Sequence, residues 1–189
     1  MRTLTYFVAV SLDGFIAAPD GDFSAFPVQG DHIEMIISDY RDTLPDVALQ
    51  ALGLTADGSR FDTTLMGWNT YAAGFPATRN PYPHTRQFVF SRTRRPQDVA
   101  EGITLTGDNP VDVVRELKKQ RGAGIWLCGG GQLAAALRPQ IDVMVLKVNP
   151  VVLGDGVPLF AGDHDPTSYR LRDSTAYGSG VLVNEYVRE

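Results

Sequence analysis

Three consecutive glycines in the second half of the chain give the clearest chemical signal. The apolar run Ile125–Cys128 ends at Gly129–Gly131, and the helix-forming run Gln132–Leu137 follows. This order predicts a buried strand, a tight turn and a helix. Glycines let the backbone approach a ligand closely, and the first N–H groups of a helix attract anions. The turn could therefore seat a pyrophosphate, and an ordinary glycine-rich strand-to-helix turn is the alternative.

Two other predicted strands end in small or polar residues. Asp62–Met66 runs into Gly67, after which Trp68–Tyr71 opens a short helix, and Arg86–Phe90 runs into Ser91–Arg92. Ligands of open α/β sheets bind at the carboxyl ends of the strands, so these ends could share one ligand with the glycine turn. The first strand lacks the G-x-G-x-x-G fingerprint, which disfavours the usual Rossmann arrangement.

The positions of these strands depend on the rest of the chain, which alternates strands and helices before ending in strands. This order predicts a mainly parallel sheet with an antiparallel edge, flanked by helices. Asp31 is expected to cap a helix, and Asn109 with Pro110 marks the start of another. The remaining expected elements are strands at Leu4–Val10, Ile103–Thr106, Ile141–Val148, Ser168–Asp173 and Gly180–Val187, a helix at Asp46–Leu52, and a loop from Asn149 to Phe160.

Composition limits the classes of partner. The 189 residues suffice for one domain spanning 1–189, with no internal repeat or linker. A net charge of −5 disfavours nucleic acid and anionic membranes as main partners. The single cysteine excludes an intrachain disulfide, and the three scattered histidines make a metal site unexpected. No segment is long enough to span a membrane, so a cytoplasmic protein is expected.

Five motifs in this order resemble the dihydrofolate reductase superfamily. They are Met-Gly-Trp-Asn-Thr-Tyr, Phe-Ser-Arg-Thr, Cys-Gly-Gly-Gly-Gln-Leu, Ser-Leu-Asp-Gly-Phe-Ile-Ala near the start and Val-Leu-Gly-Asp-Gly-Val-Pro-Leu-Phe near the end. The last two are similar to the reductase domain at the C-terminus of the bifunctional riboflavin-synthesis deaminase–reductase. The resemblance implies an α/β fold with a mostly parallel sheet of about eight strands, helices on both faces, and hydride transfer from NADPH. By the same analogy, a homodimer is expected.

The resemblance also implies which residues meet NADPH. The pyrophosphate would lie on the glycine turn, with a cis peptide between its first two glycines, and the 2′-phosphate would lie on Ser91 and Arg92, helped by Arg94 and Arg95. An arginine suits a phosphate because its planar fork pairs with two oxygens. The full set implied for the cofactor is Gly67, Trp68, Asn69, Thr70, Ser91, Arg92, Gly129, Gly130, Gly131, Gln132 and Leu133.

The substrate side has weaker signals. Asp13 and Asp31 are the candidate catalytic residues, with Glu34 beside them. An Asp-Gly turn explains Asp13 equally well, and helix capping explains Asp31 and Glu34. Three departures from the family pattern matter: Trp68 stands where many relatives have a basic residue, Phe15 where riboflavin reductases have lysine, and Cys128 where they have glutamate. Cys128 is expected to be a small buried residue rather than a nucleophile.

These departures predict a substrate other than the usual riboflavin intermediate. The leading hypothesis is an NADPH-dependent reductase that transfers hydride to a C=N or C=O bond of a small pterin- or pyrimidine-type heterocycle. One alternative is 5-amino-6-(5-phosphoribosylamino)uracil reductase of riboflavin biosynthesis. Another is a catalytically silent nucleotide-binding module that retains the cofactor seat. In each case the partner is a small molecule.

Overall fold

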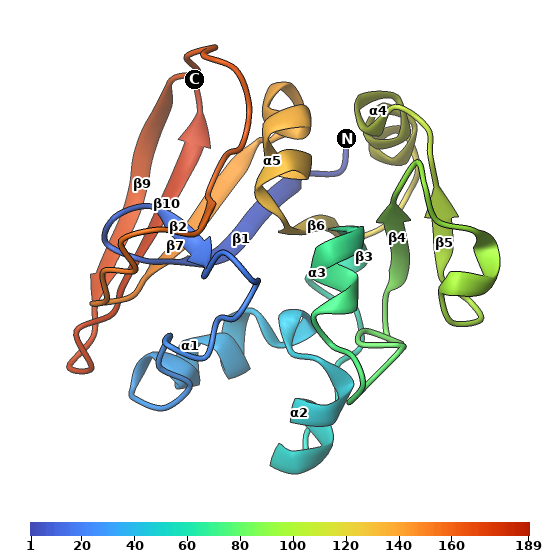
Figure 1. Cartoon of the computed structure of the whole chain (residues 1–189). Helices are drawn as coiled ribbons and strands as arrows, with labels where there is room; N and C mark the ends of the chain where they lie inside the picture. Colours follow the sequence, from blue (N-terminus) through green and yellow to red (C-terminus); the bar gives the residue numbers. More distant parts are fainter.

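The computed structural model describes all of residues 1–189 and is built on one eight-stranded sheet. Its strand order is β5-β4-β3-β6-β1-β7-β10-β9 (Figure 1). The six strands from β5 to β7 are parallel to one another, and β10 and β9 form the antiparallel edge. The strands are β1 Leu4–Val10, β3 Phe61–Gly67, β4 Arg86–Phe90, β5 Thr104–Thr106, β6 Gly124–Gly129, β7 Val143–Val148, β9 Tyr169–Ala176 and β10 Leu182–Arg188. The expected mostly parallel sheet with an antiparallel C-terminal edge is confirmed.

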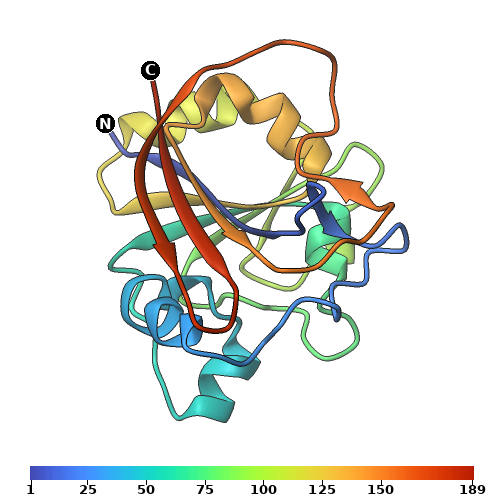
Figure 2. The ribbon, with the colours of Figure 1, turned by 90° about the vertical axis from the view of Figure 1, so that its left-hand side faces the viewer.

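Helices cover both faces of this sheet, as Figures 1 and 2 show. One face packs against α4 and α5, and the other against α1 and α3, with α2 further out (Figure 1). The helices are α1 His32–Asp39, α2 Asp46–Leu52, α3 Trp68–Ala72, α4 Pro110–Lys119 and α5 Gly131–Leu137, with short 3-10 turns at Arg41–Thr43, Pro96–Asp98 and Arg138–Gln140.

Each face has its own apolar core. On the α4 and α5 side, Leu4, Leu65 and Leu127 of the sheet pack against Leu117 and Leu137. On the α1 side, Phe7, Trp126 and Val145 pack against Ile36 and Tyr40, and the Phe7 and Tyr40 rings stack at 4.4 Å. Adjacent strand residues alternate between these two cores because successive side chains of a strand point to opposite faces.

The expected loop from Asn149 to Phe160 contains one short strand that the sequence did not reveal. Val157–Pro158 forms β8, which pairs antiparallel with β2, Phe15–Ala17, in a separate two-stranded sheet. Elements of two and three residues are too short to show a period-2 pattern, and their pairing joins distant parts of the chain.

The two predicted helix starts have different outcomes. The Asn109 side chain accepts a hydrogen bond from the Val111 N–H at 2.9 Å, and Pro110 is the first residue of α4, as expected. Asp31 stands at the N-cap position of α1, as expected, but its side chain makes no capping hydrogen bond. Its carboxylate instead accepts N–H groups of the distant β9–β10 turn, a partner that local sequence spacing does not reveal.

None of the helices combines the length and apolar character that crossing a membrane requires.

Candidate functional site

The three strand ends singled out in the sequence lie side by side in the sheet. β4, β3 and β6 are consecutive parallel neighbours, with Gly67 opposite Phe90 and Met66 opposite Gly129. The turns that follow these strands therefore meet at the side of the sheet formed by the carboxyl ends of its parallel strands, which is called the carboxyl edge of the sheet below. Figure 1 shows α3 and α5 leaving this edge next to each other.

The glycine turn faces the start of α3 at very short range. A Cβ on Gly67 would lie 3.7 Å from the Gly130 nitrogen, and a Cβ on Gly130 would lie 3.4 Å from the Thr70 hydroxyl. Gly129 has φ +144°, which favours glycine, and the peptide between Gly129 and Gly130 is cis. The two turns thus bring backbone close to backbone, with Thr70 as the nearest side chain.

The remaining residues of the turn have different surroundings. A Cβ on Gly131 would lie only 2.2 Å from the Pro158 carbonyl oxygen, so glycine is required there by the β8 segment. Leu133 is 6% exposed and belongs to the core, whereas Gln132 is exposed. Any contact of Leu133 with a ligand would therefore come from its backbone.

A basic segment follows β4 at the same edge. The Ser91 hydroxyl accepts the N–H groups of Thr93 and Arg94, both at 3.3 Å, which shapes the turn. Arg92, Arg94 and Arg95 are exposed. The Arg94 guanidinium carbon lies 4.4 Å from the centre of the Trp68 ring, a cation–π arrangement that ties this segment to α3.

Trp68 contributes both to packing and to the surface of the site. Its ring meets Tyr71 and Phe75 edge-on, at 5.7 and 6.3 Å, and is partly exposed. Asn69 beside it is exposed. Trp68 therefore packs against core aromatic rings, and Arg94 lies over one face of its ring.

Asp13 lies at the same edge, after β1, and anchors the loop before β8. Its carboxylate accepts the Ser11 hydroxyl at 2.5 Å and the N–H groups of Gly154 and Leu153 at 2.7 and 3.1 Å. The Ser11 hydrogen bond, followed by these backbone bonds, lowers the pKa of Asp13 to about 2. The charged form is therefore strongly favoured at neutral pH, which suits a residue that holds a loop.

Asp31 anchors the β9–β10 turn. Its carboxylate accepts the Gly178 N–H at 2.6 Å and the Ser179 N–H at 3.1 Å, and the Gly178 bond is the main cause that lowers the pKa of Asp31. The structure does not bring Asp31 to the glycine turn. Its catalytic role stays a prediction, as does that of Asp13.

We expect Asp31→Asn to speed amide hydrogen exchange at Gly178 and Ser179 by roughly fivefold or more, since charge-assisted hydrogen bonds are stronger than neutral ones. Because the folded pKa is lowered, the wild-type anchor should be present above the ordinary aspartate pKa and weaken as the pH falls through the lowered value. Exchange measured by mass spectrometry from pH 7 downward checks both points. Asp39→Asn, at the other end of α1, is the matched control, and equal exchange in the two variants would contradict the anchor.

Cys128 ends the apolar part of β6, immediately before the glycine turn. Burial raises the pKa of its thiol to about 12, although a hydrogen bond with the Tyr82 hydroxyl at 3.9 Å opposes the shift. Tyr82 itself packs edge-on against Trp126 at 4.9 Å. The thiol is thus kept protonated in an aromatic environment, which fits the expected packing role, although Cys128 is only partly buried rather than buried.

The native thiol of Cys128 should react with a disulfide reagent at pH 8 at least about tenfold more slowly than in the urea-unfolded chain, since the thiolate is the reactive form. Stopped-flow absorbance gives both rates, and the chain contains no other cysteine to confuse them. Similar rates in the two states would show that the fold does not protect Cys128, and a faster native rate would show that it is an activated thiol.

Sequence reasoning missed two groups on the α1 face of the sheet. His32 is fully buried; its Nδ1 lies 3.0 Å from the Ser179 hydroxyl, while Nε2 has no hydrogen-bond partner. Lys147 is partly buried near the end of β7. Burial lowers the pKa of His32, and the charge of Lys147 lowers it further. A lysine inside the run Val-Met-Val-Leu-Lys-Val was the signal that could have found the second group.

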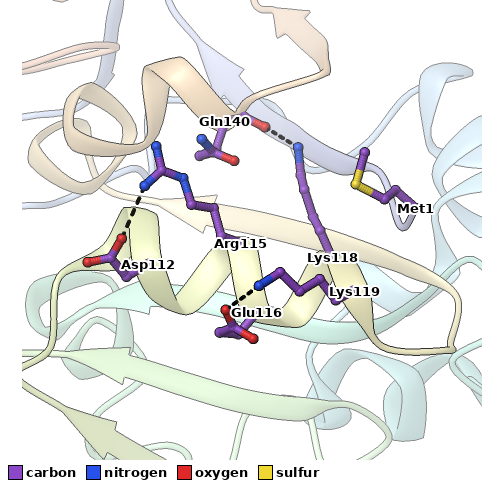
Figure 3. A pocket seen from close by; sticks show the side chains of 7 residues that line it. All are labelled: Met1, Asp112, Arg115, Glu116, Lys118, Lys119 and Gln140. Atoms are coloured by element: carbon purple, nitrogen blue, oxygen red, sulfur yellow. Dashed lines mark hydrogen bonds and ion pairs between the residues drawn. The ribbon is translucent and has the colours of Figure 1, made fainter.

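A hollow of about 410 Å³ lies elsewhere, over α4 at the amino-terminal side of β1. Its charged side chains pair with one another or with the backbone (Figure 3): Arg115 with Asp112, Lys119 with Glu116, and Lys118 with the Gln140 carbonyl. These contacts satisfy the cations of the hollow, which is remote from the strand ends described above.

The chain matches known proteins over nearly its whole length. Uncharacterized protein YwjB of Bacillus subtilis strain 168 is 30% identical over 194 residues, covering 99% of this chain and 98% of the relative. A Shewanella sp. PV-4 protein assigned to riboflavin biosynthesis is 25% identical, with a TM-score of 0.73 and coverage of 100% and 99%.

The same fold occurs in Enterococcus faecalis dihydrofolate reductase, solved with NADP(H). That enzyme is 14% identical, with a TM-score of 0.67 and coverage of 99% of this chain and 96% of the enzyme. The family model of the RibD C-terminal domain matches residues 2–183. The chain therefore belongs to the RibD C-terminal domain family and has the dihydrofolate reductase-like fold.

Proposed function

We propose that this protein is an NADPH-dependent reductase that transfers hydride to a C=N or C=O bond of a small pterin- or pyrimidine-type heterocycle. The observation that supports it most is the close approach of the glycine turn to the start of α3, at the edge of the sheet where β3 and β6 end. Membership of a reductase family gives the expected reaction type.

The residues present fit a dinucleotide. The Gly130 carbonyl accepts the Ala134 N–H at 2.9 Å, so the N–H groups of Gly131, Gln132 and Leu133 precede the first intrahelical bond and can meet a phosphate. Gly67 to Thr70 would hold the other side of the pyrophosphate. Further along the same edge, Ser91 and Arg92 would hold the 2′-phosphate, and the Trp68–Arg94 pair would lie beside the adenosine.

When bound, NADPH supplies the hydride. The chain's own contribution is to position the two rings and to exclude water between them. Cys128, near the end of β6, and Tyr82, which contacts it from the loop before β4, would border the side of the glycine turn that faces α1. Asp13 and Asp31 hold the loop before β8 and the β9–β10 turn, and through them shape the substrate side.

Reduction of 5-amino-6-(5-phosphoribosylamino)uracil-type intermediates is the second candidate, favoured by the family match. Phe15 and Cys128, which replace the lysine and glutamate of riboflavin reductases, weigh against it. A silent nucleotide-binding module is the non-enzymatic candidate.

Two measurements on the purified protein separate these candidates. Fluorescence titration should show NADPH binding, and the absorbance of NADPH at its nicotinamide band should fall with a pterin or pyrimidine substrate from a panel that includes the riboflavin intermediate. Oxidation only with that intermediate would favour the second candidate. Binding without oxidation on the whole panel would favour the silent module, and failure to bind NADPH would reject all three.

A further inference from the structure

Lys147 differs from the other lysines of the chain in having no partner. The sequence contains three lysines. Lys118 pairs with Asp142 and the Gln140 carbonyl, and Lys119 pairs with Glu116. The ammonium group of Lys147 forms no hydrogen bond or ion pair, and the residue is partly buried on a strand inside the sheet. A charge taken out of water without a partner is unfavourable, so this ammonium group is suited to receive an anion.

The sheet register places Lys147 level with the proposed cofactor seat. Tyr6 pairs with Leu127 on β6, and Ala9 pairs with Lys147 on β7. Ala9 is three residues beyond Tyr6, so the Ala9–Lys147 pair lies level with Gly130. Because β1 separates β7 from β6, the Lys147 backbone is two strand spacings, roughly 10 Å, from the line of β6. That interval accommodates one heterocyclic ring system beside a nicotinamide.

Lys147 also faces the correct side. Val145 lies two residues before it on β7 and packs with Phe7 and Trp126 in the core on the α1 side. Residues two apart on a strand share a face, so Lys147 points toward the α1 side, where Cys128 also lies. The small Ala9 side chain stands between them on β1.

Two acidic residues on the α1 side of the sheet, Asp31 and Glu185, already have other partners. Asp31 accepts the two N–H groups of the β9–β10 turn. Glu185 of β10, which pairs with Val145 of β7, forms an ion pair with Arg172. Glu34 is exposed on α1. His32, whose pKa is lowered by burial and by the charge of Lys147, is fully buried and offers no negative charge to the ammonium group.

We propose that Lys147 is the substrate-binding cation of this site, and that the substrate is a heterocycle bearing an acidic group, a carboxylate or a phosphate, which pairs with its ammonium nitrogen. This inference rests on the proposed function, because it places the substrate beside the NADPH seat. It names what the reductase assignment alone leaves open: the residue that would bind an acidic group of the substrate.

Paired ligands test it on the full chain saturated with NADP⁺. Calorimetry compares orotate with uracil, which differ by a carboxylate, and uridine monophosphate with uridine, which differ by a phosphate. The wild type should prefer the acidic member of at least one pair by about tenfold or more, the usual effect of a charge-assisted hydrogen bond. The pair that shows the preference identifies the acid group.

Lys147→Met should abolish this preference, Lys147→Arg should keep part of it, and Lys119→Met on α4 should leave it unchanged. All variants should bind NADPH with the affinity of the wild type. Failure of the wild type itself to bind NADPH would count against the proposed function, not against Lys147. A preference that is absent from both pairs, or that survives in Lys147→Met, overturns the inference.

A second readout needs no variant. Acetylation of wild-type Lys147 by a neutral reagent, followed by mass spectrometry, should be slowed by the preferred acidic ligand and not by its neutral counterpart, whereas acetylation of Lys119 should not change. Equal protection of the two lysines would show non-specific anion binding and also overturn the inference.

Discussion

Gly130→Ala should weaken NADPH binding by roughly 100-fold or more while the protein stays folded. The added methyl would stand in the gap between the glycine turn and α3, where backbone approaches backbone. A pyrophosphate held by main-chain N–H groups would be displaced by about the width of that methyl, and the contacts that depend on close approach would be lost together.

The structure explains why this substitution should spare the fold. The Thr70 hydroxyl, at 3.4 Å, is the only heavy atom within 4 Å of the added Cβ, and Gly130 has φ −96°, which any residue can adopt. Gly131 would be a poor choice, because its Cβ would strike the Pro158 carbonyl oxygen. Gly130→Val extends the same test with a larger side chain.

Fluorescence titration with NADPH and a thermal melt of the same samples give the two readouts. Gly74→Ala is the matched control: its Cβ would be similarly close to a neighbour, 3.3 Å from the Thr78 methyl, but it follows α3 on the side away from the glycine turn. Unchanged NADPH affinity in Gly130→Ala would make the turn purely structural and would remove the main support for the reductase proposal.

Arg92→Ala should weaken NADPH binding on the order of 20-fold and NADH binding less than about threefold, because only NADPH has a 2′-phosphate for the guanidinium to hold. Arg92 is exposed at the end of β4, and the Ser91 hydroxyl shapes the turn around it. Parallel titrations of the two nucleotides give the ratio.

Arg115→Ala on α4 controls for the loss of one positive charge, since Arg115 pairs with Asp112 far from the proposed cofactor seat. Equal loss of NADPH and NADH affinity in Arg92→Ala would remove Arg92 from the 2′-phosphate position. A change of ratio in Arg94→Ala instead would assign that position to Arg94, beside Trp68.

The local sequence pattern was sufficient to predict most strands and the side of the sheet at which the candidate site lies. Apolar runs of strand length ending at Gly67, Ser91 and Gly129 indicated three strand ends, and a parallel sheet brings such ends to one edge. Asn109 and Pro110 determined the start of α4 through contacts within three residues. These features depend on neighbours in the chain, so the sequence contains them directly.

Only the tertiary structure decided the roles that depend on distant partners. Asp31 carries the residue type of a helix cap, yet its carboxylate binds a turn 147 residues away. Gly131 belongs to the glycine motif, yet a glycine is required there because any side chain would collide with the Pro158 carbonyl oxygen. Lys147 is distinguished by its surroundings. Lys118 and Lys119 form ion pairs with carboxylates, whereas the ammonium group of Lys147 has no such partner. The register of β7 places Lys147 level with the glycine turn. Spacing along a chain reports periodicity and local hydrogen bonds, whereas a partner across the sheet is set by packing.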